Sequence, residues 1–145
     1  MATRSVTMVV DRELASHNEA GFACDPILVG DKSYVNMYLH WDGYPEFRGV
    51  ELANWLKINS TQDGTALAAQ LVSDNYDTGC YLYANHKNID HHYTYIIWTG
   101  KKDIWMSCWN KYSNECVFVL KPADVTRKYK IDTDYTDWLK HEKIK

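Results

Sequence analysis

The stretch SYVNMYLHWDGYPEFRGVELANWLK, residues 33–57, decides the fold because it contains a strand, a turn and a helix in succession. Residues 33–39 alternate between aliphatic side chains and polar or aromatic ones, which is the period of a half-buried strand. Asp42-Gly43 breaks that strand. Pro45 is a favourable first residue for a helix, and apolar side chains at helical spacing continue to about Lys57. The stretch therefore predicts a strand that leads directly into an amphipathic helix.

Short segments on both sides of this stretch complete the predicted architecture. Further strands, rich in β-branched and aromatic residues, are expected over Ser5–Val10, Cys80–Ala84, Tyr93–Trp98, Ile104–Trp109 and Cys116–Leu120. A second helix is expected after a cap at Asp63 or Thr65. Short helices are also expected to begin at Pro122 and at Asp134.

These elements predict one α+β domain over residues 1–145. Its sheet is expected to be mostly antiparallel, with about six strands and with two main helices packed on one face. Residues 11–32 are longer than an ordinary connection and are expected to form a surface excursion. Residues 130–145 are expected to be a peripheral C-terminal segment.

Composition and charge exclude several classes of protein. The chain is 46% hydrophobic and 24% charged, which is typical of a folded globular domain. Its formal net charge of −3 argues against an obligate binder of nucleic acid or of a membrane surface, and we expect neither partner. No apolar run approaches the length needed to span a bilayer, and the N-terminus has no hydrophobic signal region. We therefore expect a cytoplasmic location.

The cysteines and histidines do not form a recognisable metal motif. Cys24, Cys80, Cys108 and Cys116 include no C-x-x-C pair, and in a cytosolic chain we expect them to be reduced and partly buried. A denser cluster consists of His86, Asp90, His91 and His92. A zinc site there is disfavoured because adjacent histidines on a strand point to opposite faces. We expect no cofactor.

Aromatic residues are the most unusual part of the composition: the chain has 11 Tyr, 6 Trp and 3 Phe. One strand parity is expected to collect Tyr34, Tyr38, Tyr81, Tyr83, Tyr93 and Tyr95, with Trp105 and Trp109 as companions. Such a surface would be larger than monomers usually leave exposed, so it should be covered by another subunit or by a flat ligand. The alternative is an ordinary outer sheet face on which tyrosines occupy half-exposed positions.

The turn after the first quoted strand combines the residue types that hold an anion. Free backbone N–H groups at the helix start favour a negative group, and Arg48 could clamp a phosphate. The alternative is that this segment is only a turn. The predicted ligand-binding residues are Arg4, His40, Trp41, Asp42, Tyr44 and Arg48. We assign no catalytic residue, since no nucleophile accompanies His40 and Asp42.

Two segments carry a resemblance to a known family. Ala2-Thr3-Arg4-Ser5 precedes the first strand, and His40-Trp41-Asp42-Gly43-Tyr44-Pro45 leads into the first helix. The chain resembles a family of small uncharacterised proteins of bacteriophages, prophages and plasmids. Members begin M-[GA]-T-R-S and contain [HQ]-[WFY]-D-G-Y-P. The chain departs from that family at Glu46-Phe47-Arg48, where relatives commonly have Ser-Gly-His, and in its longer excursion over residues 11–32.

The resemblance implies an accessory protein of a mobile element that acts by binding in the host cytoplasm. We expect counter-defence by sequestration of a nucleotide-like signal molecule, and a homo-oligomeric assembly. Two alternatives are a direct inhibitor of a host protein and a small phosphoesterase or nuclease that uses His40 and Asp42.

Overall fold

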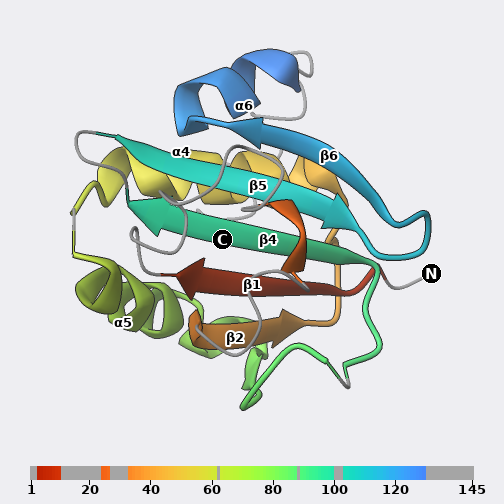
Figure 1. The fold of residues 1–145 in the computed structure, drawn as a ribbon. Helices are drawn as coiled ribbons and strands as arrows, with labels where there is room; N and C mark the ends of the chain where they lie inside the picture. Colours follow the sequence, from red (N-terminus) through yellow and green to blue (C-terminus); the bar gives the residue numbers. More distant parts are fainter. Residues whose placement is uncertain are drawn as a thin grey trace.

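The structure is a computed structural model, and it describes residues 3–10, 24–26, 33–61, 63–87, 89–99 and 103–129. The described strands form one six-stranded sheet in the order β3-β2-β1-β4-β5-β6 (Figure 1). Their bounds are Ser5–Val10 for β1, Ser33–Leu39 for β2, Tyr81–Leu82 for β3, Tyr93–Thr99 for β4, Ile104–Asn110 for β5 and Glu115–Leu120 for β6. The fold is α+β, as predicted.

The sheet is mixed, which corrects the prediction of a mostly antiparallel sheet. β1 lies in the interior of the sheet and pairs antiparallel with β2 but parallel with β4, where Ser5 faces Tyr93. The pairs β2–β3, β4–β5 and β5–β6 are antiparallel. Side-chain alternation identifies a strand but carries no information about which strand lies beside it, and for that reason the sequence could not predict the parallel pair.

The helices begin where the sequence predicts. Their bounds are Pro45–Gly49 for the π-helical turn η1, Val50–Ile58 for α4, Gly64–Asp74 for α5, Tyr76–Thr78 for the 3₁₀ turn η2 and Pro122–Lys128 for α6. Asp63 is the cap of α5, because its carboxylate accepts from the backbone N–H groups of Thr65 and Ala66. These hydrogen bonds lower the pKa of Asp63. The helix predicted to begin at Asp134 lies outside the described residues.

One set of alternating strand residues shares a core with the helices, and we call this the helix-side face. Leu52 and Leu56 of α4, Leu67 and Leu71 of α5, and Val125 of α6 belong to this core. The strand side chains in the same core are Val9, Val35, Met37, Leu39, Tyr95, Ile97, Ile104, Met106, Cys108 and Phe118. In Figure 1, α4 runs behind β5, on this side of the sheet.

The intervening strand residues form what we call the outer face. A second buried cluster there contains Val6, Met8 and Val10 of β1, Ile96 and Trp98 of β4, and Ile89 from the connection between β3 and β4. Cys24–Pro26 also lies on this face, as the orange ribbon that passes over β4 in Figure 1. The other residues of the predicted 11–32 excursion lie outside the described residues, as does the predicted peripheral segment 130–145.

A disulfide attaches Cys24 to Cys116 of β6, across a sequence separation of 92 residues. The prediction that all four cysteines are reduced is therefore wrong for this pair, because spacing along the chain does not show which cysteines meet in space. Cys80 and Cys108 are free thiols. Within the described ranges, no helix has both the length and the apolar character needed to cross a bilayer.

Candidate functional site

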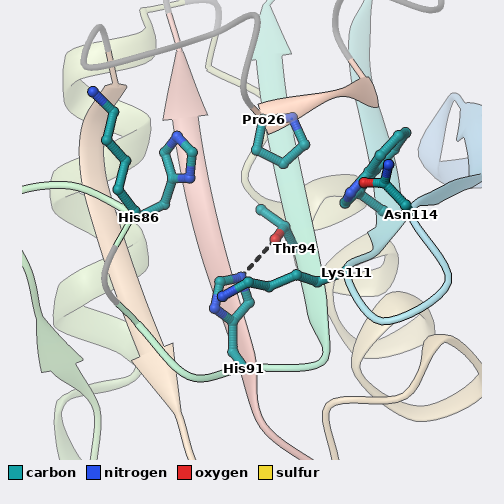
Figure 2. A pocket seen from close by; sticks show the side chains of 8 residues that line it. Pro26, His86, His91, Thr94, Lys111 and Asn114 are labelled. Atoms are coloured by element: carbon teal, nitrogen blue, oxygen red, sulfur yellow. Dashed lines mark hydrogen bonds between the residues drawn. The ribbon is translucent and has the colours of Figure 1, made fainter.

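The outer face contains a pocket of about 220 Å³. It is lined by Pro26, His86, Lys87, His91, Thr94, Trp109, Lys111 and Asn114 (Figure 2). These residues come from the Cys24–Pro26 segment, the β3–β4 connection, strands β4 and β5, and the β5–β6 turn. Cavities of about 150 Å³ hold a benzene molecule. This pocket is therefore large enough for one planar ring or one phosphate group, with the remainder of a larger ligand outside.

His91 is fixed in one tautomer at the base of the pocket. Its Nδ1 lies 3.0 Å from the carbonyl oxygen of Ile89, which can only accept, so Nδ1 carries the proton. Nε2 then accepts from the Thr94 hydroxyl at 2.7 Å, the contact dashed in Figure 2. Burial lowers the pKa of His91 to about 4, although the hydrogen bond to Ile89 acts in the opposite direction. The imidazole is therefore neutral at pH 7.

Two lysines supply positive charge at this pocket. The Lys111 ammonium group donates to the carbonyl oxygen of Ile89 at 2.6 Å, so one backbone oxygen holds both Lys111 and His91 in place. Lys87 is exposed on the β3–β4 connection. A nearby carboxylate, Asp90, is paired with Arg4 at 2.7 Å. This arrangement favours an anionic group in the pocket.

Trp109 provides the flat apolar part of the lining. It lies on β5, where it pairs with Thr94 of the neighbouring strand β4 and with Cys116 of the neighbouring strand β6. Trp109 is half-buried and forms part of the pocket lining. An aromatic wall beside two ammonium groups can hold a planar ring and a phosphate together.

The predicted anion-binding loop is divided between two regions by the structure. His40 shares a hydrogen bond of 2.8 Å between its Nδ1 and the Tyr38 hydroxyl, and its ring meets Trp41 edge to face. Trp41 is 65% exposed, and Asp42 is exposed with a φ of 56°. Burial raises the pKa of Tyr38, and the positive charge of Arg4 partly opposes this shift. Arg4 therefore lies near Tyr38.

Arg48 and Tyr44 are placed elsewhere. Arg48 is only 3% exposed, and its Nη1 donates to Glu51 of α4 and to Asn75 at the end of α5. Tyr44 packs edge to face on Phe47 at 5.9 Å between ring centroids. The structure therefore does not bring Arg48 together with Arg4 and His40, and its guanidinium group joins α4 to α5.

Gly43 explains why this turn has its sequence. Its N–H donates to the Thr3 carbonyl oxygen at 2.8 Å, and a Cβ added there would lie 2.8 Å from both that oxygen and the Ser5 Cβ. Glycine alone permits this approach to the start of β1. Gly43 thus has a structural role in the turn, and the ligand-binding role of this segment stays a prediction.

The predicted aromatic surface is also divided. Tyr38, Tyr81 and Tyr83 do gather, with ring centroids 6.2 Å and 6.0 Å from that of Tyr38. Trp105 and Trp109 face the same side as Trp98, and Tyr34 is exposed at the start of β2. Tyr93 and Tyr95 differ from the prediction, since Tyr95 belongs to the helix-side core and Tyr93 packs against it.

Tyr95 tolerates complete burial because its hydroxyl has a partner. It donates to the Gly43 carbonyl oxygen at 2.6 Å. Burial raises the pKa of Tyr95 well above its ordinary value. A buried tyrosine with a satisfied hydroxyl is compatible with a core, so residue type alone could not assign these two tyrosines to a face.

Most of the pocket was not predicted as a ligand site. The cluster of His86, Asp90, His91 and His92 stands out in the sequence, but its spacing does not predict a ligand pocket. Over the residues that the structure describes, no group of three or more His, Cys, Asp or Glu side chains is placed to hold a metal ion. Comparisons with family models, with curated proteins and with solved structures found no match to this chain.

Proposed function

We propose that the chain is a binding module that holds a nucleotide-type ligand in the outer-face pocket. In this proposal the base packs on Trp109, and a phosphate is held by Lys87 and Lys111. The observation that carries the proposal is the presence of an aromatic wall and two lysines around one opening of about 220 Å³. The net charge of −3 is a sum over the whole chain, whereas the lining of this opening includes two lysines.

The polar groups of the pocket support binding more than catalysis. The neutral His91 uses Nδ1 for Ile89 and Nε2 for Thr94, so both ring nitrogens are engaged in holding the site together. The Thr94 oxygen and the Asn114 amide remain able to accept or donate to a base edge. His40, the residue of the alternative phosphoesterase hypothesis, has its Nδ1 bonded to Tyr38. We therefore favour binding without turnover.

The biological setting is part of the same proposal and is supported by the resemblance. The motif at residues 40–45 is similar to that of proteins of phages, prophages and plasmids. An accessory protein of such an element would sequester a nucleotide signal in its host and so oppose host defence. A small pocket with fixed polar groups suits sequestration, because preorganised groups lose little conformational entropy on binding.

Isothermal titration calorimetry tests this proposal. The ligands are AMP, GMP, their 3′,5′-cyclic forms and inorganic phosphate, each titrated into the full chain without reductant. We expect at least one nucleotide to bind more tightly than phosphate alone. Trp109→Ala and Lys87→Gln should each lower the affinity for that nucleotide by about tenfold. This is the scale of one stacked base or one charged hydrogen bond.

Lys128→Gln is the matched control. Lys128 is the last residue of α6, its ammonium group lies over the Tyr129 ring, and it is outside the pocket lining. The Lys128→Gln variant should bind the nucleotide with the same affinity as the parent chain. If no nucleotide binds at millimolar concentration, the proposal is wrong. The exposed Tyr81 and Tyr83, which pack on the half-buried Tyr38, would then favour the second candidate, direct inhibition of a host protein.

A further inference from the structure

We propose that the Cys24–Cys116 disulfide regulates the outer-face pocket, and that its reduction lowers the affinity of the pocket for its ligand. The disulfide joins two parts of the lining. Cys24 lies two residues before Pro26, while Cys116 follows Asn114 and pairs with Trp109 across the β5–β6 ladder. The ligand named in this inference rests on the proposed function, but the coupling of disulfide and pocket does not.

The disulfide attaches the Pro26 side of the pocket to the sheet. Cys24 is 0% exposed, and its Sγ lies 3.4 Å from the Cys108 carbonyl oxygen. Pro26 has no backbone N–H with which to join a strand. The disulfide is a covalent link between this segment and β6, across a sequence separation of 92 residues, and its cleavage removes that link. Reduction should therefore let Pro26 move away from Thr94 and Trp109.

The two cysteine residues of the disulfide differ in their exposure to solvent. Cys116 is an exposed residue on the edge strand β6, whereas Cys24 is buried. Exchange is therefore expected to begin at the Cys116 sulfur. Cys108 approaches the disulfide only through its backbone carbonyl oxygen, and its free thiol belongs to the helix-side core, where burial raises its pKa and keeps it protonated.

The reductant is an external dithiol. One of its thiolates bonds to the Cys116 sulfur, the Cys24–Cys116 bond breaks, and the electron pair leaves on the Cys24 sulfur, which takes up a proton. The second thiolate of the reductant then attacks its own sulfur in the mixed disulfide and releases Cys116, which is also protonated. Two electrons and two protons reach the protein, and the dithiol becomes a disulfide.

Two measurements on the full chain before and after dithiothreitol test the inference. The first is the affinity for AMP. It should fall by about tenfold on reduction, because the Pro26 side of the pocket is no longer held in place before the ligand binds. The second needs no ligand: the ¹H–¹⁵N signals of the Thr94 and Lys111 amides and of the Trp109 indole should shift. Signals of Leu52 and Ile97 in the helix-side core should stay in place, and oxidised glutathione should reverse the changes.

Variants separate this disulfide from the other thiols. Cys80→Ser is the matched control, since Cys80 is a free cysteine outside the bond, and it should retain the full response. The double variant with Cys24→Ser and Cys116→Ser should resemble the reduced chain and ignore dithiothreitol. Reduction of the parent chain provides the same comparison without a mutation if that variant does not fold.

Each outcome decides between the two proposals. Pocket signals that shift while AMP binds in neither state would support the redox coupling and reject AMP as the ligand of the proposed function. AMP binding with equal affinity in both states, with unmoved pocket signals, would overturn the coupling alone. Absence of both binding and shifts would overturn both. Loss of the Leu52 and Ile97 signals on reduction would also overturn the coupling, because it would show global unfolding.

Discussion

The helix-side face and the outer face are built from the same strands but have different chemistry. On β4, Tyr95 and Ile97 enter the helix-side core, whereas Thr94 and Ile96 face the other way. The helix-side face is covered by apolar side chains of three helices. The outer face has an apolar centre that borders a pocket with His91 and two lysines. The helix-side face thus forms the core with the helices, whereas the outer face combines an apolar cluster with polar groups beside the pocket.

The largest effect is expected from a cavity on the helix-side face. Leu71 of α5 is fully buried there, so Leu71→Ala should lower the free energy of unfolding by about 2–5 kcal/mol. Urea denaturation followed by circular dichroism measures this change. Ligand affinity of the folded fraction should not change. A similar loss of affinity would contradict the division of roles between the faces.

A pH-dependent effect of similar size is expected from the outer face. The pKa of His91 is about 4 in the folded chain against 6.5 for an ordinary histidine, so between these values the unfolded chain binds the extra proton. The free energy of unfolding should therefore fall as the pH decreases from about 6.5 to about 4, by about 3 kcal/mol in total. Above pH 6.5 this contribution is complete and constant.

Urea denaturation at pH 7, 6, 5 and 4 checks this dependence. Carboxylates also titrate toward the acid end, so the useful quantity is the difference between the parent chain and His91→Gln, which has no group with this pKa. The variant should lose less stability than the parent between pH 6.5 and 4. Parallel curves would show that His91 does not couple to folding.

The smallest effect compares a tyrosine from each face. Tyr95→Phe removes the donor to the buried Gly43 carbonyl and should cost about 1–3 kcal/mol. Tyr81→Phe is the matched change on the outer face, where the residue is 61% exposed, and should alter stability by less than about 0.5 kcal/mol. Equal costs in thermal denaturation would mean that the two tyrosines are not in different environments.

Local patterns predicted the elements well. β1 and β2 have the predicted bounds, α5 begins after Asp63, and the first helix begins at Pro45. Each of these features depends on residues close together in the chain: alternation, a capping carboxylate, or a proline in a first turn. The same patterns could not place β4 beside β1, since that pairing depends on contacts between distant segments.

The pocket could not be predicted from the sequence for the same reason. His91 and Lys111 meet at the carbonyl oxygen of Ile89, a backbone atom that no motif identifies. Pro26 reaches the site through a disulfide to β6. The D-G-Y-P motif was easier to see, yet its Gly43 is explained by a close backbone approach to Thr3. A conspicuous motif indicated a turn, whereas the pocket consists of residues that are unremarkable along the chain.

The parallel pairing of β1 with β4 has a consequence for how the chain acquires its structure. Until residues 93–99 have been synthesised, β1 lacks its parallel partner, and the earlier described strands are β2 and the two-residue β3. A ribbon of so few paired residues is marginally stable in water. Completion of the sheet therefore requires β1 to pair with β4, a contact between distant segments of the chain. Topologies dominated by such contacts fold slowly. We expect a nascent chain that ends before β4 to remain open to proteolysis, and the completed sheet to form late in translation.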